Sequence, residues 1–84
     1  MNNILIDILI RLDIQVEFNS SFINVLFRER QYLFLQNCDI DNNIERLRSR
    51  LHESSNHYNK TGEALISLIE AEYRKYKIEK ILDI

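Results

Sequence analysis

The chain is organised around residues 40–82, which read IDNNIERLRSRLHESSNHYNKTGEALISLIEAEYRKYKIEKIL. Apolar residues recur through this stretch at alternating steps of four and three, which places them along one side of an α-helix. The stripe consists of Ile40, Ile44, Leu47, Leu51, Tyr58, Leu65 and Leu68. Such spacing predicts helical structure whose apolar side is buried, without saying whether this chain or another one buries it.

The middle of this stretch is the weakest part of the helical pattern. Ser54 and Thr61 occupy stripe positions, and residues 54–62 contain Ser, Asn, His and the only glycine of the chain. These residue types favour loops. We therefore predict two helices joined by a loop at 54–62. One unbroken helix is the alternative, because the heptad phase continues across the gap.

The N-terminal part of the chain changes its periodicity near position 13. Five apolar residues before that point fall on the buried side of a short helix: Ile4, Leu5, Ile8, Leu9 and Leu12. After Asp13 the helical pattern fails, and apolar residues alternate with polar ones. Alternation of this kind predicts a strand over residues 14–18.

Two more apolar runs, at residues 22–27 and 32–35, are rich in aromatic and β-branched residues, as strands prefer. Short polar segments at 19–21 and 28–31 separate the three runs, which predicts an antiparallel meander. The competing interpretation is one helix over residues 21–36. The predicted fold class is therefore α+β, with a short N-terminal helix, a three-stranded antiparallel meander and a C-terminal helical hairpin or long helix. An all-α bundle is the alternative.

Length and composition limit the class of protein. A chain of 84 residues, 45% hydrophobic and 29% charged, fits a single small folded domain over residues 1–84. The single cysteine, Cys38, cannot form an internal disulfide, which favours a reducing, cytoplasmic location. Asp7, Arg11 and Asp13 interrupt the apolar N-terminus, so we predict no signal peptide, no transmembrane helix and no membrane partner.

No catalytic, metal or cofactor motif stands out. His52 and His57 are five residues apart, whereas a zinc site on one helix face needs a spacing of four. Cys38 has no base near it in sequence, and Asp39 or Asp41 is suited to capping the helix that follows. We therefore expect no catalytic residues, no metal and no cofactor, and a protein that is not an enzyme.

The apolar content exceeds what one small sheet readily covers, and exposed apolar area of this kind marks interfaces. The predicted function is a non-catalytic protein-interaction or assembly module, either a homo-oligomer or a subunit of a larger complex. The predicted interface is the apolar face of the C-terminal helical region. It comprises Tyr58, Leu65, Leu68, Ile69, Tyr73 and Tyr76.

The alternative function is a small nucleic-acid-binding regulator. Its contacts would be the basic cluster Arg74, Lys75, Lys77 and Lys80. The formal net charge of -2 and the glutamates interleaved with these residues favour the assembly module over nucleic-acid binding.

Overall fold

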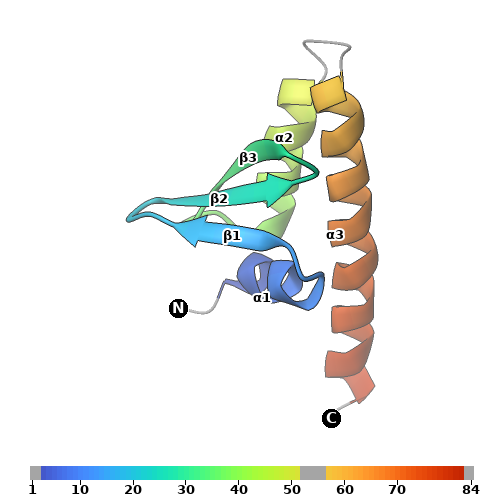
Figure 1. Cartoon of the computed structure of the whole chain (residues 1–84). Coiled ribbons are helices and arrows are strands. Elements are labelled where there is room, and N and C mark those ends of the chain that lie inside the picture. The colour runs from blue at the N-terminus through green and yellow to red at the C-terminus, as the bar shows by residue number, and fades with distance from the viewer. Residues whose placement is uncertain (1–2, 52–56, 83–84) are drawn as a thin grey trace.

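The computed structural model describes residues 3–51 and 57–82, with side chains described at all of these positions except 57, 58 and 82. The elements follow in the order α1 (Ile4–Arg11), β1 (Gln15–Phe18), β2 (Phe22–Phe27), β3 (Arg30–Leu35), α2 (Ile40–Leu51) and α3 (His57–Leu82). The predicted α+β fold is therefore confirmed, and the all-α alternative is wrong. α2 and α3 lie side by side as a helical hairpin, so the alternative of one long helix is also wrong (Figure 1).

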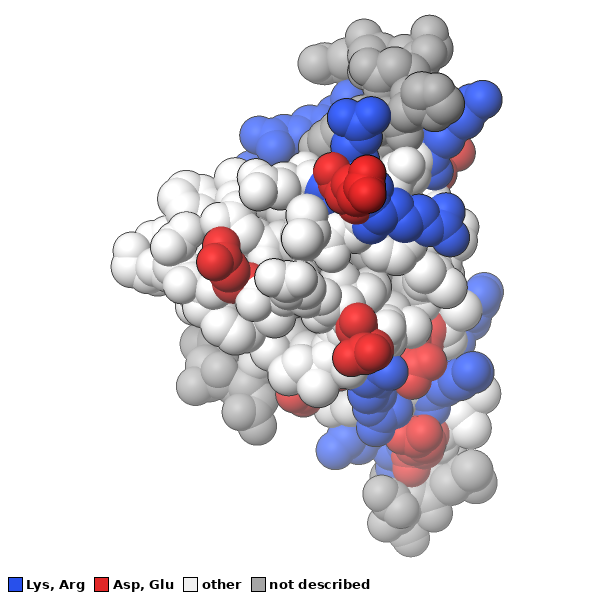
Figure 2. Space-filling model, in the orientation of Figure 1, with Lys and Arg blue, Asp and Glu red and all other residues white. Residues whose placement is uncertain are grey.

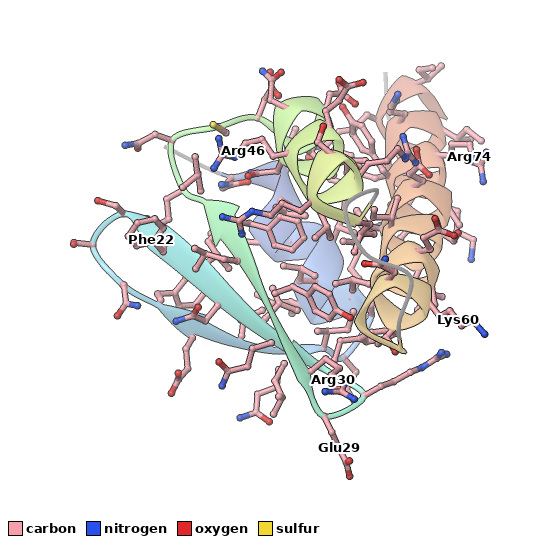
Figure 3. The ribbon with its side chains drawn as sticks, turned by 90° about the horizontal axis from the view of Figure 1, so that it is seen from above. Phe22, Glu29, Arg30, Arg46, Lys60 and Arg74 are labelled. Atoms are coloured by element: carbon pink, nitrogen blue, oxygen red, sulfur yellow. The ribbon has the colours of Figure 1, made fainter. Side chains whose placement is uncertain are left out.

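The three strands form one antiparallel sheet in the order β1-β2-β3. One face of this sheet carries Ile23 and Val25, each 0% exposed, and Tyr32 and Phe34, each 1% exposed. All three helices gather on that side of the sheet, as Figures 1 and 3 show. The fold is thus a layer of helices on one face of a sheet, and no described helix covers the other face.

Local hydrogen bonds explain both ends of α1. The Asn3 side chain accepts from the Leu5 N–H at 3.0 Å and caps the first turn. At the other end, Asp13 adopts a left-handed conformation with φ 57°. Its N–H donates to the Ile10 carbonyl, and the Ile14 N–H donates to the Leu9 carbonyl, both at 3.0 Å. This pair of hydrogen bonds is the Schellman motif that ends a helix, and it turns the chain into β1.

The β2–β3 hairpin turns on only two residues, Arg28 and Glu29, because Phe27 pairs directly with Arg30. Both turn residues have positive φ, at 50° and 66°. The twist of a two-residue hairpin demands this conformation, although Asn and Gly adopt it more readily than Arg and Glu. The predicted separating segment 28–31 was therefore too long, and Figure 3 shows Glu29 and Arg30 at the tip of the hairpin.

The predicted loop at 54–62 also needs correction, because α3 begins at His57. Gly62 is buried inside this helix instead of lying in a loop. A Cβ atom at Gly62 would lie 2.7 Å from Leu51 Cδ2 and 3.1 Å from Tyr32 Cε1. The missing side chain therefore lets α3 approach the end of α2 and the sheet closely.

A buried amide fixes the connection from the sheet to α2. The Asn43 side chain, 1% exposed, accepts from the Leu35 N–H at 2.9 Å and donates to the carbonyls of Leu35 at 3.0 Å and Cys38 at 3.3 Å. Asp39 accepts from the Asn42 N–H at 2.8 Å, which confirms the predicted helix cap. Buried polar groups are stable only when paired, and here the pairing sets where α2 starts.

One cluster of buried side chains joins the three helices to the sheet: Leu5, Ile8, Leu9, Ile23, Val25, Tyr32, Phe34, Ile40, Ile44, Leu47, Leu51, Leu65, Ile66 and Ile69. The molecule measures 43 × 26 × 21 Å. α3 sets the long dimension, since its 26 residues extend about 39 Å. Its C-terminal part continues past α1 (Figure 1). Within the described ranges, none of the helices is both long and apolar enough to span a lipid bilayer.

Candidate functional site

The structure divides the predicted interface residues between the core and the surface. Leu65 and Ile69 are each 0% exposed because they pack inside this chain. They contribute to the fold and lie beneath the surface that a partner would reach. Leu68 lies on the outside of α3 and is 39% exposed. The Tyr58 side chain falls outside the described residues.

The other two predicted interface residues, Tyr73 and Tyr76, are half-buried and have cationic neighbours within the chain. Lys77 Nζ lies 4.2 Å from the centre of the Tyr73 ring. Arg11 Cζ and Lys80 Nζ lie 5.3 Å and 5.4 Å from the centre of the Tyr76 ring. Burial raises the pKa of Tyr73, and nearby carboxylates raise it further.

The basic residues proposed for nucleic-acid contact, Arg74, Lys75, Lys77 and Lys80, are all exposed on α3. Acidic groups lie among them: Glu72 is 3.9 Å from Lys75 Nζ, and Glu79 is 2.8 Å from Arg11. Figure 2 shows blue and red side chains mixed along this helix. The four residues therefore share one helix with acidic neighbours instead of forming an unmixed basic face in this part of the chain.

A second apolar stripe runs along the outside of α3. We define the outer stripe as Ala64, Leu68, Ala71, Lys75 and Ile78, which follow each other at steps of four and three. Ile78 is 56% exposed, and both alanines are partly exposed. Figure 3 shows Lys60 and Arg74, also on α3, pointing away from the sheet. The outer stripe is therefore an apolar heptad pattern that the described part of the chain leaves uncovered.

The uncovered face of the sheet is the second exposed apolar surface. We define the open face by the outward positions of the strands: Gln15, Glu17, Phe22, Asn24, Leu26, Gln31, Leu33 and Leu35. Phe22 and Leu26 are each 40% exposed and Leu33 is 37% exposed. Glu17 is the only charged residue of this set. Figure 2 accordingly shows few charged atoms over β1 and β2.

Sequence reasoning missed the open face, although a signal for it was present. β2 has large apolar residues at both alternating positions, since Phe22 and Leu26 point outward while Ile23 and Val25 point inward. In a strand with one solvated face, apolar residues alternate with polar ones. A strand with apolar residues on both faces normally has a packed layer on each side. β2 thus carries large apolar residues on the face that the described part of the chain leaves uncovered.

The described part of the molecule has two hollows on its surface. A shallow hollow of about 190 Å³ lies on the sheet and is lined by Glu17, Asn24, Leu26 and Gln31, among others. A wider one of about 800 Å³ lies between the start of α1, the β3–α2 connection and Tyr73, with Cys38 on its wall. Within the described ranges, no three His, Cys, Asp or Glu side chains come together in a way that suits a metal ion. His52 and the His57 side chain lie outside the described residues.

Comparison of this chain with protein-family models, with curated proteins and with solved structures found no match.

Proposed function

We propose that this protein is a non-catalytic assembly module that associates with further copies of itself through the outer stripe of α3. The outer stripe carries this proposal, because it places exposed Leu68 and Ile78 on one side of the longest helix, at coiled-coil spacing. Apolar patches of this kind on a folded domain are typical of protein interfaces.

The composition of the outer stripe suits a helix that packs against another protein surface. Ala64 and Ala71 are small, so a partner surface can approach the α3 backbone closely. Lys75 is the only charged residue of the stripe, and its side chain is 71% exposed. A single polar residue within an apolar seam reduces affinity and selects the partner and the register.

The size of the outer stripe predicts weak association. Completing the burial of Leu68 and Ile78 contributes about 1 kcal/mol each, since full burial of such side chains is worth about 1.5–3 kcal/mol. Association also costs several kcal/mol of translational and rotational freedom. These two side chains alone do not offset that cost, so the partner surface has to bury apolar area of its own, and we expect weak oligomers that form and dissociate with concentration.

The test compares Leu68→Asp with Ser67→Asp, two changes that add the same charge to neighbouring exposed positions of α3. Light scattering after size exclusion should show the Leu68→Asp protein as a monomer where the Ser67→Asp protein still associates. Far-ultraviolet circular dichroism confirms that both remain folded. Equal masses for the two variants would contradict the proposal. Salt-sensitive binding to an RNA or DNA oligonucleotide, lost on charge reversal at Lys75 and Lys77, would support the nucleic-acid alternative instead.

A further inference from the structure

We infer that the outer stripe of one copy docks on the open face of the sheet of another copy, with Lys75 placed against Glu17. This inference rests on the proposed function and names the surface that the outer stripe meets. It would give the sheet a second helical layer on the face that the described chain leaves bare. Two-layer and three-layer packing of helices on sheets is a common way for proteins to bury both surfaces.

Charge complementarity supports this pairing. The open face has one charged residue, Glu17, and the outer stripe has one charged residue, Lys75. The hollow of about 190 Å³ beside Glu17 is also lined by Asn24 and Gln31. An ammonium group entering this hollow would meet one carboxylate and amide oxygens, which together can accept its three N–H donors. Lys75, which lies 3.9 Å from Glu72 of its own chain, thus gains a second acidic partner, and Glu17 gains a basic one.

Size and shape support it as well. The outer strands of a three-stranded sheet lie about 10 Å apart, which matches the diameter of a single helix. Phe22 and Leu26 are four residues apart on β2, or about 13 Å. Leu68 and Ile78 are ten residues apart on α3, or about 15 Å. The apolar positions of the two surfaces therefore extend over similar lengths.

The two symmetric pairings fit the charges less well. Two outer stripes packed on each other would leave Lys75 with only Glu72 of its own chain, at 3.9 Å and beside the stripe. Two open faces packed on each other would bury Glu17 with no basic residue among the outward positions of either sheet. An unpaired charge in an apolar interface is costly, so the mixed pairing is favoured.

A charge exchange tests the contact between Glu17 and Lys75. At low salt, Glu17→Lys and Lys75→Glu should each weaken self-association by about tenfold, because each replaces an attraction by a repulsion. The double variant should recover to within about threefold of the unchanged protein. Glu45→Lys and Arg46→Glu, two charge reversals at exposed positions of α2, serve as matched controls. Failure of the double variant to recover would overturn the inference.

Mixing two blocked variants separates this inference from the proposed function. Leu33→Asp blocks the open face and Leu68→Asp blocks the outer stripe. Each should be monomeric alone, whereas a one-to-one mixture should form a complex, since every copy retains one intact surface of opposite kind. Mass by analytical ultracentrifugation and circular dichroism of each variant are the readouts. If Leu33→Asp associates alone as well as the unchanged protein, the open face is not used, and the outer stripe retains its proposed role. If the folded variants do not associate when mixed, the inference is wrong.

Discussion

Gly62→Ala adds one methyl group at the point where α3, α2 and the sheet approach most closely. The new Cβ would lie 2.7 Å and 2.9 Å from the two Cδ atoms of Leu51 and 3.1 Å from Tyr32 Cε1. Both Leu51 methyl groups are too near, so Leu51 has to change its χ1 or χ2 rotamer to relieve the contact. Leu51 is only 4% exposed, so its buried neighbours have to give way to the new rotamer.

Two opposing effects decide the sign of the change in stability. Replacing glycine by alanine inside a helix stabilises it by about 1 kcal/mol. Adding a methyl group to a packed core costs about 1–3 kcal/mol. We expect the packing cost to exceed the helix gain, for a net loss of about 1 kcal/mol. In a domain of this size that loss lowers the melting temperature by about 4–8 °C.

Urea denaturation of four proteins measures this balance: the unchanged chain, Gly62→Ala, Leu51→Val and the double variant. Leu51→Val removes both Cδ atoms, so Gly62→Ala should stabilise the Leu51→Val protein by up to about 1 kcal/mol. The same substitution would thus change sign with its neighbour. If Gly62→Ala stabilises the unchanged chain as much as it stabilises Leu51→Val, the close packing described here is wrong.

Three further changes test other parts of the fold. Replacing Arg28 by Asn and Glu29 by Gly together should raise the free energy of unfolding by about 1 kcal/mol, because Asn and Gly favour the positive φ of the turn. An unchanged melting temperature in thermal unfolding would argue against that turn. Asn43→Ala should cost about 1–3 kcal/mol in urea denaturation, since it leaves the Leu35 N–H unpaired and the Leu35 carbonyl with only the 3.4 Å bond from the Cys38 N–H. A loss below about 0.5 kcal/mol speaks against the buried amide. The fold raises the pKa of Tyr73 above 10.0 through burial and nearby carboxylates, so the neutral phenol stabilises the folded state below pH 10. That contribution is lost as the pH rises through the raised pKa. The Tyr73→Phe protein should therefore lose less stability above pH 10 than the unchanged protein, and parallel plots of unfolding free energy against pH would contradict this.

Local patterns predicted most of the fold. The change from helical spacing to alternation near Asp13 located the end of α1 and the start of β1, because the left-handed residue there breaks the helix. The apolar runs of aromatic and β-branched residues at β2 and β3, separated by short polar segments, predicted the meander. The errors concern segment lengths. Arg28 and Glu29 form a turn that normally uses Asn and Gly. Gly62 lies inside α3 at a close contact between elements, but a glycine between polar residues in the sequence suggests a loop.

The candidate surfaces were harder to predict, because a stripe of apolar residues does not reveal what covers it. Leu65 and Leu68 belong to the same predicted face, yet Leu65 is 0% exposed in the core while Leu68 is 39% exposed on the outside. The apolar residues of α3 extend around more than one side, and only the position of α1 and α2 determines which side remains exposed. The open face likewise depends on the sheet having helices on one side only.

Self-association is tested by the molar mass of the unchanged protein in solution, measured by light scattering over a hundredfold range of concentration at low and high salt. We expect the mass to rise above the 10.1 kDa of one chain as the concentration increases, and to do so at both salt levels, because apolar contacts dominate the proposed interface. A mass of one chain at every concentration would contradict the proposed self-association through the outer stripe.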